Sequence, residues 1–199
     1  MDYAATHPDA VVMYLISDMQ VAVHSDASYL SESKARSRTS GHFFLASDVP
    51  IPANNGAVLN TANLIKTIMS SAAEAEMGAI FLNAREDTPA RNALIEMGHP
   101  HGQTSFHTDN STAHGVCNNN MQCKRSKSWD MRFYWMRCTE SQKMFRVFWR
   151  SGTTNLADYF TKHHPAAHHR NVRPEFVTTG TVVNKLRLTR QKKTSQFSF

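Results

Sequence analysis

Four acidic residues stand where the ends of predicted elements can bring their side chains together. Asp26 follows an alternating stretch, Glu76 lies early in a predicted helix, Asp109 follows a short strand, and Asp158 begins a late helix. Carboxylates gathered in one pocket repel each other unless divalent cations neutralise them. Oxygen ligands suit Mg²⁺ or Mn²⁺, and two such ions can cleave a phosphodiester bond by in-line displacement. Spacing alone leaves open that each acid is only a cap or a turn former.

The elements that must position these acids follow from the hydrophobic pattern. Alternation over residues 20–28 predicts a half-buried strand with Asp26 near its C-terminal end. Further strands are expected at 41–46, 57–69, 104–108 and 144–149. Helices are expected at 70–82, continuing at 91–97 after a break near Pro89, then at 111–117, at 129–138 and from 156 to 162. This order predicts an α/β fold with a five-stranded mixed sheet and helices on both faces.

Composition narrows the class of partner and the compartment. The chain of 199 residues has a formal charge of +6 and a sequence pI near 9.4, which favours an anionic partner without identifying it. Cys117, Cys123 and Cys138 form no CxxC pair, which disfavours a zinc site or a disulfide framework and indicates a reducing compartment. No apolar run reaches the roughly 18 residues of a membrane span, so we expect a protein without membrane association.

Four sequence blocks occur in a fixed order around the acids. They are Ser25-Asp26-Ala27-Ser28 with Arg38-Thr39-Ser40-Gly41 downstream, Ser70 to Met77, His107 to Ala113, and Asn155 to Lys162. Together they resemble the ribonuclease H domain of copia-type retrotransposon polyproteins, over about residues 20 to 165. The resemblance implies a ribonuclease H-like fold that hydrolyses the RNA strand of RNA/DNA hybrids during reverse transcription.

The resemblance also assigns roles by position. It implies that Asp26, Glu76, Asp109 and Asp158 are catalytic and hold two Mg²⁺ or Mn²⁺ ions. Glu74 is a competing acid, but on a helix it points about 200° away from Glu76 and cannot share its role. Glu76 is preferred because a small residue precedes it and an apolar one follows, as in the general pattern of the fold.

Expected contacts to nucleic acid lie beside the acids and in a basic stretch. Recognition of a hybrid depends on shape and 2′-hydroxyl groups rather than on base sequence. The expected contact residues are Ser28, Asn110, Ser111, Lys124, Arg125 and Lys127. The first three are equally good helix caps or turn formers. In the helix that follows, Trp129, Phe133 and Met136 share one stripe and are expected in the core.

Three further expectations concern the ends of the chain, its partners and the histidines. Residues 1–19 are interpreted as the remnant of a polymerase connection, 20–165 as the ribonuclease H-like domain, and 166–199 as a basic, disordered tail. The implied partner is the reverse transcriptase region of the same polyprotein, and the implied location is cytoplasmic, in a virus-like particle, or nuclear. His24 and His107 are expected to be satisfied or partly buried histidines rather than metal ligands.

Two other functions compete with an active hybrid-specific endonuclease. One is an inactive retroelement remnant that binds nucleic acid or protein, and the other is an integrase or resolvase that cuts DNA. The absence of a zinc-binding His/Cys module and the match of all four blocks weigh against the integrase or resolvase. The histidine that other ribonucleases H carry before the last acid is missing from the loop 150–154, so the donor of the leaving-group proton is unassigned.

Overall fold

The computed structural model describes residues 5–118 and 130–180, and the chain divides into two compact units. The larger unit, residues 16–163, contains all four acids. The smaller unit joins the two ends of the chain: β1 (Ala10–Val11) pairs antiparallel with β7 (Thr178–Thr179), and α5 (Ala166–Phe176) precedes β7. Part of the segment expected to be disordered is therefore helical. Across the described residues, no helix has the length and apolar character that a membrane crossing requires.

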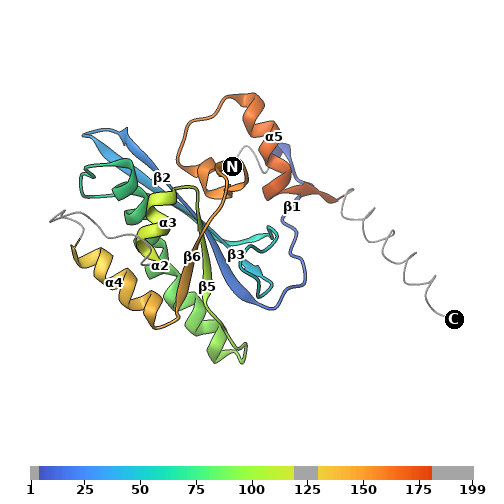
Figure 1. Ribbon diagram of the computed structural model, residues 1–199. Helices are drawn as coiled ribbons and strands as arrows, with labels where there is room; N and C mark the ends of the chain where they lie inside the picture. The colour runs from blue at the N-terminus through green and yellow to red at the C-terminus, as the bar shows by residue number, and fades with distance from the viewer. Residues whose placement is uncertain (1–4, 119–129, 181–199) are drawn as a thin grey trace. The chain divides into compact units, whose positions relative to one another are not determined.

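A five-stranded mixed sheet forms the centre of the larger unit (Figure 1). Strands β2 (Gln20–Glu32), β3 (Arg36–Ala46) and β4 (Ala57–Leu64) form an antiparallel meander. Strands β5 (Thr104–Thr108) and β6 (Phe145–Trp149) are parallel to β2 and to each other. The strand order β4-β3-β2-β5-β6 places β2 at the centre, and the predicted five-stranded mixed sheet is confirmed.

Strand β2 extends further than the sequence pattern predicts. Its ladder with β5 ends at the pair His24–His107, but its antiparallel pairing with β3 continues to Glu32 and Arg36. The prediction that Asp26 lies near the C-terminal end of its strand is therefore wrong, because β2 continues, paired with β3, as far as Glu32. What ends near Asp26 is the neighbouring strand β5, and this leaves room beside Asp26 for side chains from other elements.

Helix α2 (Ala72–Glu96) is one continuous helix, so the predicted break near Pro89 is wrong. Proline removes one backbone N–H from a helix, but packing on both sides can hold the helix together. Ala84 and Leu94 are both buried, on either side of Pro89. The guanidinium of Arg91 also donates to the backbone oxygens of His101 (3.2 Å) and Met144 (3.1 Å), which fixes the C-terminal half of the helix.

The apolar core lies between the sheet and three helices. Odd-numbered residues of β2 and β3, such as Val21 and Phe43, share one face of the sheet with α2, α3 (Ser111–Cys117) and α4 (Asp130–Ser141). The predicted core residues of α4 are confirmed for two positions: Phe133 and Met136 are buried in this cluster, while Trp129 lies outside the described residues. The expected positions of α3 and β5 are also confirmed.

The opposite face of the sheet carries a short 3₁₀ helix, η2 (Leu156–Phe160), where the sequence predicts the start of a longer helix. Its Leu156 backbone N–H donates to His24 Nδ1 at 3.0 Å, and the Ser40 hydroxyl donates to the Ala157 oxygen at 2.7 Å. Both His24 and Ser40 lie on even-numbered positions, facing away from α2. The sheet thus has helical elements on both faces, and η2 brings Asp158 to the strand that carries Asp26.

Gly41 is the point where α2 packs most closely on β3. A Cβ atom there would lie 2.5 Å from Asn83 Oδ1 and 2.8 Å from Thr61 Oγ1. Asn83 cannot move freely, because its amide donates to the Ser25 hydroxyl at 2.9 Å and to the Ser40 oxygen at 2.8 Å. Gly41→Ala should therefore reduce the free energy of unfolding by about 2 to 3 kcal/mol, measured by urea denaturation.

Gly102→Ala is the matched control for that substitution. A Cβ at Gly102 would have only ordinary contacts, with Gln20 Oε1 at 3.6 Å as the nearest atom. Its stability should stay within about 0.5 kcal/mol of the wild type. A Gly41→Ala protein as stable as the Gly102→Ala protein would contradict the close packing of α2 on β3.

Asp87 on α2 makes stability depend on pH. Burial raises the pKa of Asp87 from 3.8 to about 7, and the nearby charge of Arg91 offsets only part of this. The folded chain keeps a proton that the unfolded chain releases above pH 4, so stability falls as pH rises from about 4 to about 7. Asp87→Asn should remove this decline and be more stable than the wild type at pH 8 by a few kcal/mol. Urea denaturation of both proteins at several pH values is the measurement, and parallel stability curves would contradict the prediction.

Candidate active site

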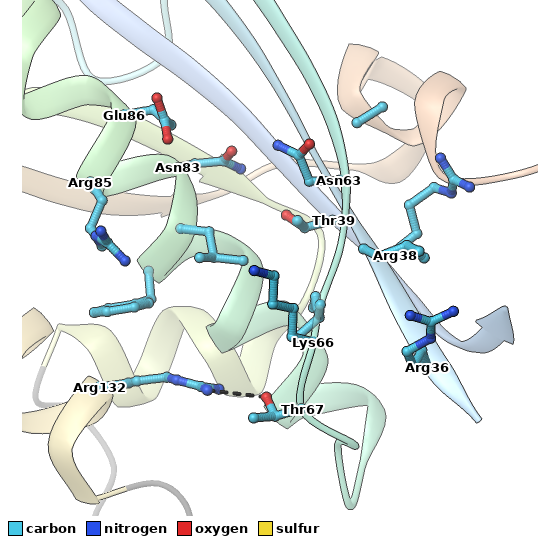
Figure 2. Close-up of a pocket in the computed structure, with 15 residues that line it drawn as sticks. Arg36, Arg38, Thr39, Asn63, Lys66, Thr67, Asn83, Arg85, Glu86 and Arg132 are labelled. Carbon is cyan, nitrogen blue, oxygen red and sulfur yellow. Dashed lines mark hydrogen bonds between the residues drawn. The ribbon is translucent and has the colours of Figure 1, made fainter. Parts of the chain in front are cut away.

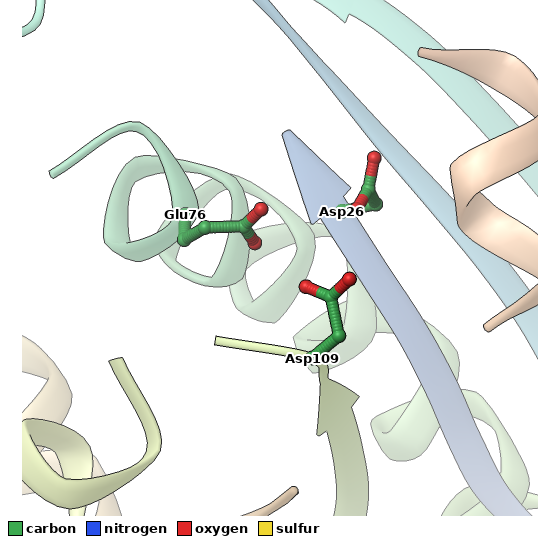
Figure 3. A group of neighbouring side chains, drawn as sticks. All are labelled: Asp26, Glu76 and Asp109. Carbon is green, nitrogen blue, oxygen red and sulfur yellow. The ribbon is translucent and has the colours of Figure 1, made fainter. Parts of the chain in front are cut away.

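Three of the four predicted acids converge where β5 ends. Asp26 from β2, Glu76 from α2 and Asp109 just after β5 each place a carboxylate oxygen within 4.8 Å of the others. Figure 3 shows Glu76 and Asp109 directed toward the space beside β2 where Asp26 lies. Asp26 and Glu76 are only 2% and 6% exposed, and Asp109 is half-buried. The three carboxylates therefore form a compact acidic cluster, called the acidic pocket, in which two are buried and one is partly exposed.

Hydrogen bonds from two strands orient the Glu76 carboxylate. The Ala27 backbone N–H donates to Glu76 Oε1 at 3.2 Å, and the Thr108 hydroxyl donates to Oε2 at 3.3 Å. Thr108 Oγ1 also accepts from the Asn110 backbone N–H at 3.2 Å. Glu76 thus connects β2 to the end of β5, and this fixes it between Asp26 and Asp109.

Glu74 has a different role, in agreement with the preference for Glu76. The Ser71 hydroxyl caps α2 by accepting from the Glu74 backbone N–H at 3.1 Å. The Glu74 carboxylate in turn accepts from the Ser70 backbone N–H at 2.7 Å. This reciprocal pattern satisfies free donors at the start of the helix. Glu74 therefore fixes where α2 begins, and so which turn of the helix presents Glu76.

Asp109 is held by the segment that follows β6. The Trp149 indole donates to the Asp109 backbone oxygen at 2.9 Å, and the Arg150 backbone N–H donates to the Thr108 oxygen at 2.8 Å. Gly152, in the 3₁₀ turn η1 (Gly152–Thr154), lies against the carboxylate: a Cβ there would be 2.6 Å from Asp109 Oδ2. The absence of a side chain at Gly152 is what gives this carboxylate its position.

Asp158 lies outside the three-acid group and forms an ion pair with Lys162. The segment that carries it is tied to β2, because the Asn155 amide donates to the Ser25 oxygen at 3.0 Å. The Thr161 hydroxyl donates to Asp26 Oδ2, so the turn containing Asp158 also orients Asp26. Asp158 is thus beside the group without belonging to it, and its role as a fourth ligand stays a prediction.

The electrostatics of the pocket indicate a cation-binding site. The pKa of Asp26 is raised to about 6. Burial is the largest cause and the charges of Asp158 and Asp109 add to it, while the Thr161 hydrogen bond and the charge of Lys162 oppose it. Burial, followed by the charges of Asp26 and Asp109, raises the pKa of Glu76 well above its usual value. Such a group of carboxylates binds either protons or a cation. Because every donor is a carboxylate oxygen, the residues fit a hard divalent ion such as Mg²⁺ or Mn²⁺.

The residues expected to contact nucleic acid have mixed positions. Asn110 caps α3, where its Oδ1 accepts from the Ala113 backbone N–H at 2.9 Å, and Ser111 is exposed on the first turn of that helix. Ser28 is buried, with its hydroxyl against that of Ser31. Lys124, Arg125 and Lys127 lie outside the described residues. Their contacts with nucleic acid stay predictions.

A row of histidines runs across the sheet beneath η2. His42, His24 and His107 are neighbours on β3, β2 and β5, and all three are buried. His24 is bonded, as expected, by the Leu156 N–H and by Arg150 at 3.1 Å. His107 is buried as well, but neither of its ring nitrogens has a hydrogen-bond partner among the described residues. Burial lowers the pKa of His107 to about 4, so the ring is neutral near pH 7.

Sequence reasoning missed several residues that shape the pocket. Thr108, Gly152 and Thr161 act through contacts between elements that are distant in the sequence, whereas Lys162 pairs with Asp158 four residues before it. Thr161 and Lys162 do lie inside the last of the four blocks, which was a usable signal. Nothing in the sequence marked Gly152, because its importance comes from the position of Asp109.

Comparison with solved structures identifies the fold. No family model and no curated protein matches the sequence. Among solved structures, LC11 ribonuclease H1, isolated from compost, is similar with a TM-score of 0.54 at 10% identity, over 71% of this chain and 92% of that one. The fold is that of a ribonuclease H.

Two further solved structures are similar to this chain. LC11 ribonuclease H1 in complex with an RNA/DNA hybrid is similar with a TM-score of 0.51 at 8% identity, over 70% of this chain and 92% of that one. The ribonuclease H domain of prototype foamy virus has a TM-score of 0.45 at 12% identity, over 71% of this chain and 88% of that one. The likeness to the two LC11 structures shows the fold alone, so the chemistry must be argued from the pocket itself.

Proposed function

We propose that the chain is an endonuclease that hydrolyses the RNA strand of RNA/DNA hybrids with two Mg²⁺ or Mn²⁺ ions. The observation that carries this proposal is the convergence of Asp26, Glu76 and Asp109 at the end of β5 in a ribonuclease H fold. The hybrid bound in the LC11 ribonuclease H1 complex supports the choice of substrate.

In this proposal the acids bind the metal ions and the neighbouring residues fix the positions of the acids. Asp26, Glu76 and Asp109 hold the ions, with Asp158 as the fourth ligand after it separates from Lys162. When bound, two such ions activate a water molecule and stabilise the leaving oxygen. Thr161 fixes the orientation of the Asp26 carboxylate through its hydrogen bond. Together these contacts fix the positions of the ligands before a substrate arrives, and this lowers the entropy cost of reaching the reactive geometry.

The biological setting rests on the four sequence blocks that resemble copia-type ribonuclease H domains. We propose that the chain acts in retrotransposon reverse transcription beside the reverse transcriptase region of its polyprotein. That region would connect through residues 1–19, in a cytoplasmic virus-like particle or in the nucleus. Ser111 and Asn110 on α3, together with the basic stretch from Lys124 to Lys127, would contact the hybrid.

A panel of labelled substrates tests the proposal. The full chain is incubated with Mg²⁺ and a hybrid, an RNA duplex, a DNA duplex or single-stranded RNA of the same sequence, each labelled on one strand at a time. We expect cuts only in the RNA strand of the hybrid. Cleavage of the DNA duplex would instead support the integrase or resolvase alternative, and binding of the hybrid without any cleavage would support the inactive remnant.

A further inference from the structure

A groove lined by cations lies on the larger unit, between β3, β4 and helix α2. Its volume is about 820 Å³, and it is lined by residues of these elements, by the loop that joins β4 to α2, and by Arg132 of α4. Figure 2 shows Arg36 and Arg38 at one side, Lys66 in the middle, and Arg85 and Arg132 at the other side. Glu86 is the one acid among the lining residues. None of the four predicted catalytic acids lines this groove.

Most of the positive charge of the groove is not neutralised by nearby acids. Arg38 pairs with Glu32 at 2.7 Å. Arg36, Lys66, Arg85 and Arg132 form no ion pair with any residue that the structure describes. Arg85 and Lys66 are exposed, so their charges face solvent. A concave surface with this excess of positive charge attracts polyanions.

Aromatic side chains are interleaved with these cations. The guanidinium carbons of Arg85 and Arg132 each lie 5.9 Å from the centre of the Phe81 ring. Phe81 packs edge to face on Trp135 at 5.2 Å, and a second hollow of about 470 Å³ continues from Phe81 to Trp135 and Met131. Planar guanidinium groups beside aromatic rings form a surface on which unpaired bases stack.

A buried hydroxyl lies in the wall of this groove. Thr39 is 1% exposed and lines the groove, yet its Oγ1 has no hydrogen-bond partner among the described residues. In the view of Figure 2, Thr39 lies just below Asn63. An unpaired buried hydroxyl is costly. This one lies beneath the surface of the groove, so Thr39 places a polar group in the wall of the groove rather than an exposed contact.

We propose that this groove binds single-stranded nucleic acid. Arg36 and Lys66 contact backbone phosphates, while Arg85 and Arg132, supported by Phe81, stack on unpaired bases. A single strand presents bases and phosphates together, whereas a duplex keeps its bases inside and an acidic peptide has only charge. This binding needs neither the acids nor a metal ion, so it extends the function beyond cleavage.

Affinity for a labelled single strand tests the proposal. Fluorescence anisotropy is measured for a DNA strand of about 12 nucleotides, near the length that one domain covers. The full chain with Asp109→Asn is used in the presence of EDTA, so that nothing is cut and failure of the cleavage proposal does not affect the result. Adding Lys66→Ala with Arg85→Ala should weaken binding at least about tenfold and reduce the slope of log affinity against log salt by about 0.7, because only Lys66 of these two residues contacts a phosphate.

A matched control removes a cation elsewhere. Arg146 is exposed on β6, the strand at the opposite edge of the sheet from β4. Arg146→Ala in the same background should bind the single strand like its parent. Equal losses for Arg146→Ala and for the groove variant, or an unchanged affinity of the groove variant, would overturn the proposal.

A strand without bases separates stacking from charge attraction. An abasic strand of equal length should bind at least about tenfold more weakly than the normal strand, since each stacked base contributes about 1 to 3 kcal/mol. Arg132→Lys keeps the charge but loses the planar guanidinium group. The affinities for the normal and the abasic strand should therefore differ less for this variant. If the abasic strand or a poly-glutamate of equal charge bound as tightly as the normal strand, the groove would be a general polyanion site and the proposal would be wrong.

Discussion

Asp109→Asn should abolish cleavage of an RNA/DNA hybrid. Asn keeps the size of the side chain but removes the negative charge of the Asp109 carboxylate, one of the three in the acidic pocket. Loss of one charge-stabilising group in an active site lowers the rate by about 10²- to 10³-fold, and loss of a metal ligand should reach at least the upper end of this range. Glu76→Gln should have the same effect, because Glu76 connects both strands of the site. The measurement is the single-turnover cleavage rate of a labelled hybrid with Mg²⁺.

The stability of these variants serves as the control for folding. Burial raises the pKa of Glu76 well above its usual value, so its ionised form is less favourable in the folded than in the unfolded chain. This penalty grows as pH rises above the unfolded pKa. In EDTA at pH 8, Glu76→Gln should therefore be at least as stable as the wild type. A variant that both unfolds and loses activity would not support the assignment, and one that retains full activity would contradict it.

Gly152→Ala should reduce cleavage about 10- to 100-fold without changing any acid. Its Cβ would lie 2.6 Å from Asp109 Oδ2, closer than real contacts allow, so the carboxylate or the η1 turn must move. A displacement of about 1 Å in a catalytic group can cost about 10²-fold in rate. Stability should change by less than about 1 kcal/mol, because η1 contains no buried residue.

Gly102→Ala provides the matched control in this experiment as well. It adds the same methyl group in a loop next to β5, where a Cβ has only ordinary contacts. Its cleavage rate should equal that of the wild type. A Gly152→Ala protein that cleaves as fast as the Gly102→Ala protein would show that the described position of Asp109 is not the active one.

Local signals in the sequence predicted most of the larger unit. The alternation of β2 and the caps at the starts of α2 and α3 depend on only a few residues, so the existence of these three elements and the place where each begins were predicted. Pro89 was misinterpreted because packing of both halves of α2 outweighs one lost hydrogen bond. The length of β2 was underestimated because its extension depends on pairing with β3. Helix α5 was missed because its polar and histidine-rich sequence has no apolar stripe.

The sequence identified candidate acidic residues of the site, but it did not predict how these residues lie relative to one another. The sequence blocks distinguish Glu76 from Glu74, and the structure places Glu76 beside Asp26 and Asp109. The pairing of Asp158 with Lys162 is local, but the position of the η2 segment depends on its hydrogen bonds to β2 and β3, more than 100 residues before it. The support from Thr161 likewise depends on a contact between residues 135 positions apart.

The most direct test of the account is cleavage of a hybrid whose RNA strand is labelled. Purified wild-type chain and Asp109→Asn are compared with Mg²⁺ and with EDTA, and hybrid binding is followed in the same samples by gel retardation. The account predicts RNA fragments only for the wild type with Mg²⁺, while both proteins retard the hybrid. An intact RNA strand in every sample, with the hybrid still retarded by the wild type, would contradict it.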